Sequence, residues 1–267
     1  MPISIDACVA QHQADRKEQQ DRVAILSHPR RRGIVLAMVA DGMGGYAGGS
    51  LAAEQVLHTA KSSLEHYSPA EEAPEKMLEA SMLEAHTMIR ASRFINEKEP
   101  HSTAVMLLLQ PGRLTWGHCG DSRLYRFRGD QLLTRSVDHS YVEHLLSQGK
   151  INAEQALTHP NRNILLTSLG GQDEPKFNIS ESYELQAGDN FVLCSDGLWA
   201  YFDDAEMGGI VAAYPARRAC EILVERARER GAGGGDNVSL AIIKLVENKI
   251  ETVKPKPPAG FVPRARV

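Results

Sequence analysis

The chain has 267 residues, of which 42% are hydrophobic and 24% are charged, and its formal net charge is −4. This composition is typical of a globular protein with one large core or two small ones. The negative balance argues against nucleic acid as the main partner, and no apolar run is long enough to cross a bilayer. We therefore expect neither nucleic acid nor a membrane among the partners.

The cysteines and the first residues indicate the compartment. The four cysteines form no Cys-x-x-Cys motif and have no disulfide-like spacing. Residues 1–15 lack the basic start and the apolar stretch of a secretion signal. We expect a cytoplasmic protein with reduced thiols.

Hydrophobic periodicity predicts strands, two long helices, more strands, a second pair of helices and a closing strand. The predicted strands are residues 3–10, 23–26, 34–40, 103–109, 114–119, 123–127, 131–134, 177–185, 191–194 and 238–246. The predicted helices are residues 50–67 (with Ser50 as N-cap), 77–95, 141–148, 153–157, 205–214 and 216–230. Short connections between the strands from 103 to 134 predict an antiparallel meander. The order fits an α+β fold with two antiparallel sheets and helices outside them.

The domain organisation is expected to be simple. Residues 1–246 show no internal repeat and no second core, so we expect one domain. Residues 247–267 are rich in proline, lysine and arginine and poor in apolar residues, which predicts a disordered tail. This tail either docks a partner or has no role, and the second alternative is the simpler one.

Four aspartates each lie beside glycine and next to a strand-like run. Asp41 and Asp196 follow apolar runs and precede glycine, Asp121 follows glycine, and Asp236 follows three glycines just before the last strand. Glycine lets the backbone turn and lets a ligand approach closely. A carboxylate held at the rim of a rigid core, beside exposed main chain, suits a hard cation.

The residue types around these aspartates favour Mg²⁺ or Mn²⁺ over zinc, because few histidines or thiolates accompany them. Several carboxylates around one point can hold two ions, which make a water nucleophilic and stabilise an in-line displacement at phosphorus. Negative charge builds up on the phosphoryl oxygens, so an arginine is expected close by. Arg16, in a polar loop between the first two strands, is the candidate.

Each of these features also has a simpler explanation. An aspartate beside glycine is usually part of a turn, and we expect this for Asp130 and Asp189. For Asp41 or Asp196 alone the two interpretations are about even, whereas the four aspartates together favour a metal. Residues 42–49 are glycine-rich but lack the lysine of a P-loop, so nucleotide binding is not expected. Structural or surface roles are expected for His101, His118 and His139, and a structural role for Ser195.

Taken together, the motifs resemble those of the bacterial PPM/PP2C metal-dependent protein serine/threonine phosphatases. The matching segments follow the family's order from about residue 5 to residue 246. They are residues 16–22, 39–45 (Val-Ala-Asp-Gly-Met-Gly-Gly), 102–104, 117–125 (Gly-His-Cys-Gly-Asp-Ser-Arg-Leu-Tyr), 138–140, 159–163, 193–198 (Leu-Cys-Ser-Asp-Gly-Leu) and 235–238. Any one alone would be weak, but the set is specific.

The resemblance implies a four-layer α-β-β-α sandwich with metals in a cleft at one end. It implies that Asp41 bridges two metals, that Gly42 adds its backbone carbonyl, and that Asp196 and Asp236 complete the first site. It assigns a third, weaker metal to Asp121, a position beside the second metal to Asp21, acting through water, and phosphate binding to Arg16. Residues 140–169 correspond to the family's mobile flap, which touches substrate.

The chain departs from the family pattern at two positions. Gln19 stands where asparagine is usual, outside the metal ligands. Tyr46 stands where bacterial members commonly have histidine. If that histidine protonates the leaving group, this chain must use tyrosine, water or another residue. Alkyl phosphates are then expected to react more slowly, and aryl phosphates to be less affected.

These observations predict a protein serine/threonine phosphatase with two or three Mg²⁺ or Mn²⁺ ions. Its expected substrates are phosphorylated proteins, the targets of a serine/threonine kinase of the same cell, and it is expected to be a monomer. One alternative is a catalytically weak pseudo-phosphatase that acts as a binding module, favoured only by Tyr46. The other is a hydrolase of small phosphate esters.

Overall fold

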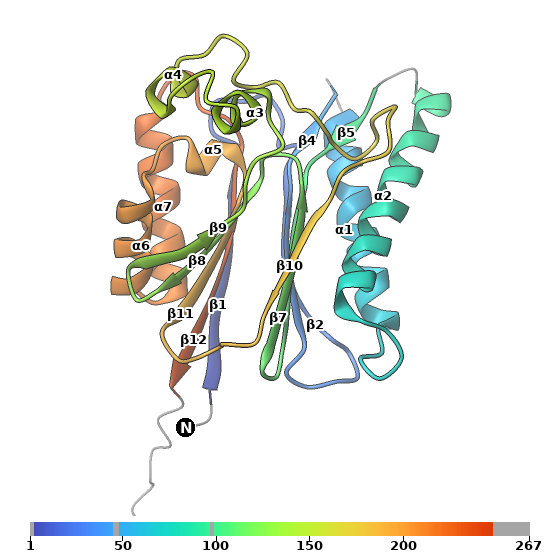
Figure 1. Ribbon diagram of the computed structural model, residues 1–267, viewed down its shortest axis with the longest axis vertical. Coiled ribbons are helices and arrows are strands. Elements are labelled where there is room, and N and C mark those ends of the chain that lie inside the picture. The colour runs from blue at the N-terminus through green and yellow to red at the C-terminus, as the bar shows by residue number, and fades with distance from the viewer. Residues whose placement is uncertain (1–2, 45–47, 97–98, 248–267) are drawn as a thin grey trace, which may run out of the picture.

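The computed structural model describes residues 3–44, 48–96 and 99–247, which form four layers (Figure 1). Two five-stranded antiparallel sheets lie face to face, with one pair of long helices outside each sheet. This arrangement confirms the predicted α+β sandwich. Tyr46 lies outside the described residues, as does the predicted tail of residues 247–267 except Glu247, which ends the last strand.

The two sheets are each built from strands that are far apart in the sequence. The first sheet has the order β1 (Ile3–His12), β12 (Val238–Glu247), β11 (Asp189–Cys194), β8 (Arg123–Arg128) and β9 (Gln131–Arg135). The second has the order β10 (Asn178–Ser182), β7 (Arg113–Cys119), β6 (Ala104–Gln110), β3 (Val35–Ala40) and β2 (Arg22–Ser27). A small two-stranded sheet pairs β4 (Gly42–Met43) with β5 (His101–Ser102).

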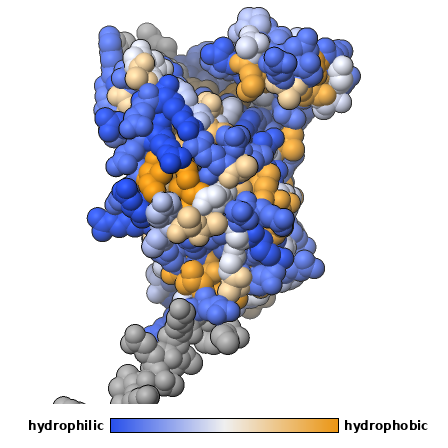
Figure 2. Space-filling view, turned by 90° about the vertical axis from the view of Figure 1, so that its left-hand side faces the viewer, coloured by the Kyte–Doolittle hydropathy of each residue, from blue (hydrophilic) through white to orange (hydrophobic). Residues whose placement is uncertain are grey.

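The helices bury apolar stripes against the outer faces of the sheets. Helices α1 (Gly48–His66) and α2 (Pro74–Asn96) cover the second sheet, and α6 (Asp204–Ala213) and α7 (Ala216–Arg230) cover the first. The short helices are α3 (Tyr141–Ser147), α4 (Ala153–Leu157) and α5 (Asp196–Trp199). The face that carries α6 and α7 is largely hydrophilic, with small apolar patches (Figure 2). Among the described helices, none has the length and apolar character needed to span a membrane.

Strand β3 shows why the strand-like runs are continuously apolar. All six of its residues are buried. Alternate side chains of a strand point to opposite faces. Val35, Ala37 and Val39 therefore pack between the two sheets, while Leu36 and Met38 pack under the helices. A strand enclosed on both faces has no polar side, and it forms a rigid support for the residue that follows it.

Two local predictions are wrong. The strands from 104 to 135 do not form one meander, because β7 and β8 belong to different sheets. A short connection does not force pairing: Gly120, with φ of +100°, lets residues 120–122 cross from one sheet to the other. Helix α1 begins at Gly48, so Ser50 is not its N-cap. The helical turn α5, which begins two residues after Cys194, was not predicted.

Candidate metal centre

The predicted acidic residues lie at one end of the two sheets, the upper end in Figure 1. Strand β3 ends directly before Asp41, next to the start of β2. Strand β11 ends two residues before Asp196, next to the starts of β8 and β12. Antiparallel pairing thus brings together the segments that carry all five acidic residues: Asp21, Asp41, Asp121, Asp196 and Asp236.

A cavity of about 570 Å³ opens between these segments. Its lining includes six of the predicted site residues, namely Arg16, Asp41, Gly42, Asp121, Asp196 and Asp236. Asp21 is buried beside the cavity, and its Oδ2 accepts a hydrogen bond of 2.8 Å from Ser195 Oγ. The residues named from the sequence therefore meet in one place, with Asp21 just behind the wall.

Asp41 is fixed through its backbone, so its side chain starts from a defined position. Its N–H donates to Thr103 Oγ1 at 3.0 Å, and its carbonyl accepts from the Thr103 N–H at 2.9 Å and from Ser102 Oγ at 3.1 Å. The next residue, Gly42, has no room for a side chain, because a Cβ there would lie 2.0 Å from the carbonyl oxygen of Gly49. Close backbone packing therefore requires glycine after Asp41.

Asp196 is the first residue of α5, with Ser195 before it. Its Oδ1 is buried and has no hydrogen-bond partner among the described residues. The Ser195 hydroxyl bonds to Asp21 and also accepts the Ser239 N–H at 3.1 Å. Ser195 therefore ties β12 to the loop before β2, which agrees with the structural role predicted for it. An unpartnered buried carboxylate oxygen is unusual and suits a cation ligand.

The loop that carries Asp121 is held from both sides. The carbonyl of Asp121 accepts a hydrogen bond from Trp199 Nε1 at 3.0 Å. The guanidinium of Arg123 lies 3.5 Å from the centre of the Trp199 ring and forms two hydrogen bonds, of 2.8 and 2.7 Å, with the carboxylate of Asp138. The backbone N–H of His139 donates to the carbonyl of Gly120 at 3.0 Å. These contacts hold the sheet crossing at the rim of the cavity.

Arg16 and Asp236 face each other across the cavity mouth, and the guanidinium donates to the Asp236 carboxylate. Asn237 joins the two loops that carry them. Its Nδ2 donates to the carbonyls of Gln13 at 2.9 Å and Glu18 at 3.0 Å, and its Oδ1 accepts from the Gln20 N–H at 2.8 Å. The arginine loop is therefore fastened to the loop of a predicted metal ligand.

The carboxyl groups of the site strongly perturb one another. Burial raises the pKa of Asp21 to about 7, of Asp121 to about 8 and of Asp196 to about 6, and it raises that of Asp41 well above its usual value. Repulsion by the neighbouring carboxylates adds to the effect of burial in each case. Arg16 compensates part of this negative charge through Asp236, and a divalent ion would supply more.

The arrangement is open rather than a finished coordination shell. Within residues 3–44, 48–96 and 99–247, no three His, Cys, Asp or Glu side chains already surround a single ion-sized point. Asp236 is turned toward Arg16 instead. The donors are nevertheless suitable for hard divalent ions, because all are oxygens and one of them is unpartnered.

Residues 140–169 form one edge of the cavity, to which they contribute Asn163 and Leu165. The segment contains α3 and α4. Several of its apolar side chains are exposed, including Leu157 at 75% and Leu166 at 55%. Exposed apolar residues beside a polar cavity provide a surface on which a large substrate can rest.

Several supporting residues had no assigned role at the sequence level. Thr103 bonds to the backbone of Asp41 and Trp199 to that of Asp121, whereas Asn237 holds the loop of Arg16 and Asp138 holds the side chain of Arg123. Thr103, Asp138 and Asn237 lie inside the matching motifs, and their place in a motif was the available signal. No such signal pointed to Trp199, because its contact with Asp121 joins segments 78 residues apart.

Comparison with known proteins identifies the class. Residues 10–234 match the family model described as protein phosphatase 2C. This match covers most of the sequence, and the chain belongs to the protein phosphatase 2C family. The resemblance predicted from the motifs is therefore confirmed.

Named relatives and a solved structure agree with this family. Protein phosphatase PhpP of Streptococcus pneumoniae is 29% identical over 259 residues, which cover 94% of this chain and 100% of the relative. Serine/threonine protein phosphatase PstP of Mycobacterium tuberculosis is 32% identical over 221 residues, 80% of this chain. The chain spans only 41% of the length of PstP. A crystal structure of the PstP catalytic domain in complex with two manganese ions matches with a TM-score of 0.78 at 25% identity, covering 92% of this chain and 100% of that one.

Proposed function

We propose that the chain is a metal-dependent phosphatase that removes phosphate from phosphoserine and phosphothreonine in proteins. The observation that carries this proposal is the cavity in which Asp41, Asp121 and Asp196 share a wall with Arg16. Carboxylates for divalent ions and a guanidinium for a phosphate are the two components that phosphoryl transfer to water requires. Membership of the family and the names of its relatives support the same activity.

The proposed metal ligands are those that the family resemblance implies, and the carboxylates that line the cavity support them. Asp41 would hold both ions, and the carbonyl of Gly42, Asp196 and Asp236 would complete the first site. Asp121 would hold a third ion, and Asp21 would lie beside the second and act through water. The two manganese ions in the PstP catalytic domain support Mn²⁺ or Mg²⁺ in these roles. When bound, such ions make a water nucleophilic and neutralise charge on the phosphoryl oxygens.

The side chains of the protein then orient the substrate. Arg16 presents a planar set of donors that matches two phosphate oxygens. The guanidinium now bonds to Asp236 at the cavity mouth. This contact would have to open, or be shared, for Arg16 to bind an entering phosphate. Asn237 keeps the Arg16 loop in register with the ligands. Because no side chain acts as the nucleophile, no covalent phosphoenzyme is expected.

The surroundings of the cavity favour a protein substrate over a small ester. We propose that residues 140–169 are a flap over the cavity and that residues 1–246 form the phosphatase domain. The exposed apolar side chains of the flap would contact residues beside the phosphorylated one. We further propose a cytoplasmic monomer that opposes a serine/threonine kinase of the same cell.

The test is a metal-titrated assay on a phosphothreonine peptide. We expect hydrolysis that requires Mn²⁺ or Mg²⁺, stops with chelator, and disappears in Asp196→Asn. Asp130→Asn is the matched control, because Asp130 also lies beside glycine but in the exposed β8–β9 turn, and it should keep full activity. Full activity in Asp196→Asn would refute the assignment of the site.

Two other outcomes correspond to the alternatives. Binding of the phosphopeptide without turnover would identify a pseudo-phosphatase, the alternative that Tyr46 favours. Equal turnover of a phosphoprotein and free phosphoserine would identify a hydrolase of small esters. A Tyr46→His variant tested on alkyl and aryl phosphates measures whether that position affects the leaving group.

A further inference from the structure

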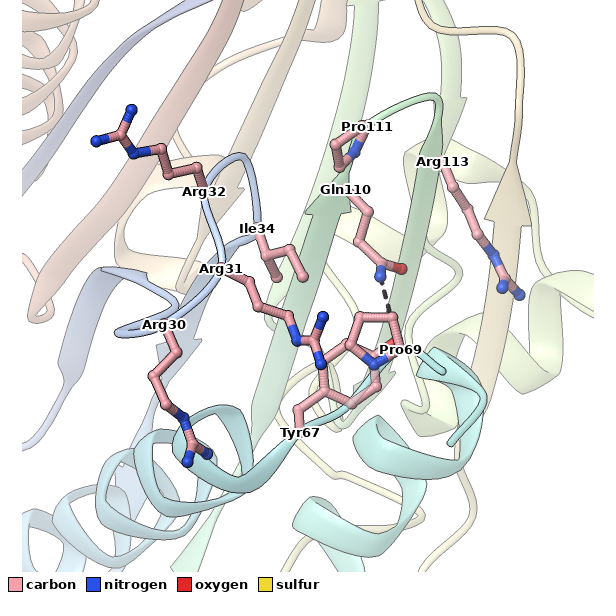
Figure 3. Close-up of a pocket in the computed structure, with 9 residues that line it drawn as sticks. All are labelled: Arg30, Arg31, Arg32, Ile34, Tyr67, Pro69, Gln110, Pro111 and Arg113. Carbon is pink, nitrogen blue, oxygen red and sulfur yellow. Dashed lines mark hydrogen bonds between the residues drawn. The ribbon is translucent and has the colours of Figure 1, made fainter. Parts of the chain in front are cut away.

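A second cavity, of about 590 Å³, lies at the end of the sheets opposite the candidate metal centre (Figure 3). Three connections line it, the β2–β3 turn, the β6–β7 turn and the segment between α1 and α2. Strand β3 and its flanks run from one cavity to the other, a distance on the order of 20 Å at about 3.3 Å per residue. The two cavities are therefore separate sites.

The β2–β3 turn carries three consecutive arginines, Arg30, Arg31 and Arg32, all exposed. Arg30 donates to the backbone carbonyl of Glu65 at 2.7 Å, and Arg31 lies 3.5 Å from Ser68 Oγ. Among the described residues, none of the three pairs with a carboxylate. Three uncompensated cations are thus gathered on one turn of a chain whose net charge is −4.

The turn is held in place by a buried histidine. His28 Nδ1 accepts the backbone N–H groups of Arg30 and Arg31, each at 3.1 Å, and its Nε2 donates to the carbonyl of Tyr67 at 2.9 Å. Gly33, with φ of +81°, completes the turn. A turn fixed in this way presents its arginines in a constant position, which lowers the entropy lost when they bind.

The floor of the cavity is apolar with polar atoms at its edge. Figure 3 shows Arg31 reaching over Tyr67 and Pro69, while Arg32 and Arg113 point outward on either side. Arg113 already pairs with Glu75 and, at 2.6 Å, with Glu181, but its buried Nε has no partner among the described residues. The arginines on the turn are therefore the ones available to a ligand.

We propose that this cavity docks an acidic segment of a protein substrate, away from the phosphate that is removed. This inference rests on the proposed function for its account of the occupant. Guanidinium groups pair with carboxylates or phosphates, and Tyr67 and Pro69 fit an apolar side chain between them. Most of the residues that line the cavity are exposed, so the site is open to solvent. An open site suits a peptide segment better than a small molecule that must be enclosed.

The direct test is binding of a fluorescein-labelled, unphosphorylated, glutamate-rich peptide, measured by anisotropy. We expect the double variant Arg31→Ala/Arg32→Ala to lose roughly tenfold in affinity, and the wild-type affinity to fall with added salt. The matched control is Arg217→Ala/Arg218→Ala, which removes two exposed arginines from α7 and should bind like wild type. Equal affinity in both double variants would overturn the proposal, as would binding only to inorganic phosphate or to phosphatidylserine vesicles.

A kinetic test connects the two sites. A long phosphothreonine peptide with an acidic stretch at least about ten residues from the phosphate can span both, whereas a short one cannot. Arg31→Ala/Arg32→Ala should raise KM several-fold for the long peptide and leave the short peptide and p-nitrophenyl phosphate unchanged. If wild type cleaves neither peptide, the proposed activity fails, but the anisotropy result still decides whether the turn binds acidic segments. Equal KM values for the two peptides in both proteins would refute the docking role.

Discussion

Two aspartates at opposite ends of β11 show how differently this fold treats a buried carboxyl group. Asp196 follows the cleft end of the strand, where neighbouring carboxylates and burial raise its pKa to about 6. Asp189 starts the strand at the far end and is fully buried. Burial alone would raise the pKa of Asp189, but hydrogen bonds from Arg128 and Arg126 outweigh it and lower the pKa. The difference lies in the partners: Asp189 accepts hydrogen bonds from two guanidinium groups, whereas Asp196 has no guanidinium bonded to it and its Oδ1 has no hydrogen-bond partner among the described residues.

The same contrast extends to the surfaces at the two ends. The cleft gathers acidic groups that share one cavity, and the opposite end gathers arginines around another. A site that leaves buried charges uncompensated loses stability, which is typical where function requires it. We therefore expect substitutions at the cleft end to lower activity without lowering stability. Substitutions at the far end should lower stability without lowering specific activity.

The largest effect is expected from Asp41→Asn. Loss of the carboxylate that we propose as the bridge should lower kcat/KM on a phosphothreonine peptide by about 10³-fold or more, because both ions would depend on it. In chelator, the same variant should unfold at a temperature equal to or above that of wild type, since one member of a repelling cluster has been neutralised. A clear fall in Tm with activity retained would contradict the account of the cleft.

Asp189→Asn tests the far end. Removing this charge leaves Arg126, whose side chain is 9% exposed, without its counterion, and should destabilise the fold by about 3–5 kcal/mol. The pKa of Asp189 is lower in the folded protein than its ordinary value of 3.8. The extra stability of wild type over the variant is therefore present above pH 3.8 and is lost as the pH falls through the folded pKa. Denaturant unfolding of both proteins at several pH values measures this difference.

The control for that experiment is Asp204→Asn, which removes an exposed pair with Arg135 at 3.2 Å. Exposed pairs contribute less than about 1 kcal/mol, so this variant should unfold almost as wild type does. If Asp189→Asn were equally mild, the buried pair at the far end would not be the stabilising element described here.

A smaller effect is expected from Asn237→Ala. The side chain holds the Arg16 loop by three hydrogen bonds, and its loss should lower kcat/KM by about 10- to 100-fold, as for residues that orient metal ligands. Asn190→Ala is a matched control at the far end, where Asn190 Nδ2 also donates to two backbone carbonyls, each at 3.1 Å. The control should lose stability but keep its specific activity. Equal activity losses in the two variants would show that Asn237 acts through stability alone.

The sequence predicted the elements well because their signals are local. Apolar runs such as residues 34–40 and the helical spacing of 77–95 report the faces that a strand or helix buries. The site residues came from motifs in which an aspartate adjoins glycine at the end of a strand. The structure places those residues around one cavity, and their roles as ligands remain predictions.

The sequence could not predict features that depend on distant partners. The crossing at Gly120 looks like an ordinary hairpin turn until the two sheets are known. Asp189 and Asp196 both adjoin glycine, and only Arg126 and Arg128 on another strand separate their environments. The sequence of residues 30–32 predicts only a basic turn. The cavity beside this turn is formed together with distant residues such as Tyr67, which the sequence does not place there.

The most direct test of the central claim is a calorimetric titration of the protein with Mn²⁺. The account predicts saturable binding of at least two ions to wild type, and loss of that binding in Asp41→Asn while the variant remains folded. Binding of equal strength and number in the two proteins, or no saturable binding to wild type, would contradict it.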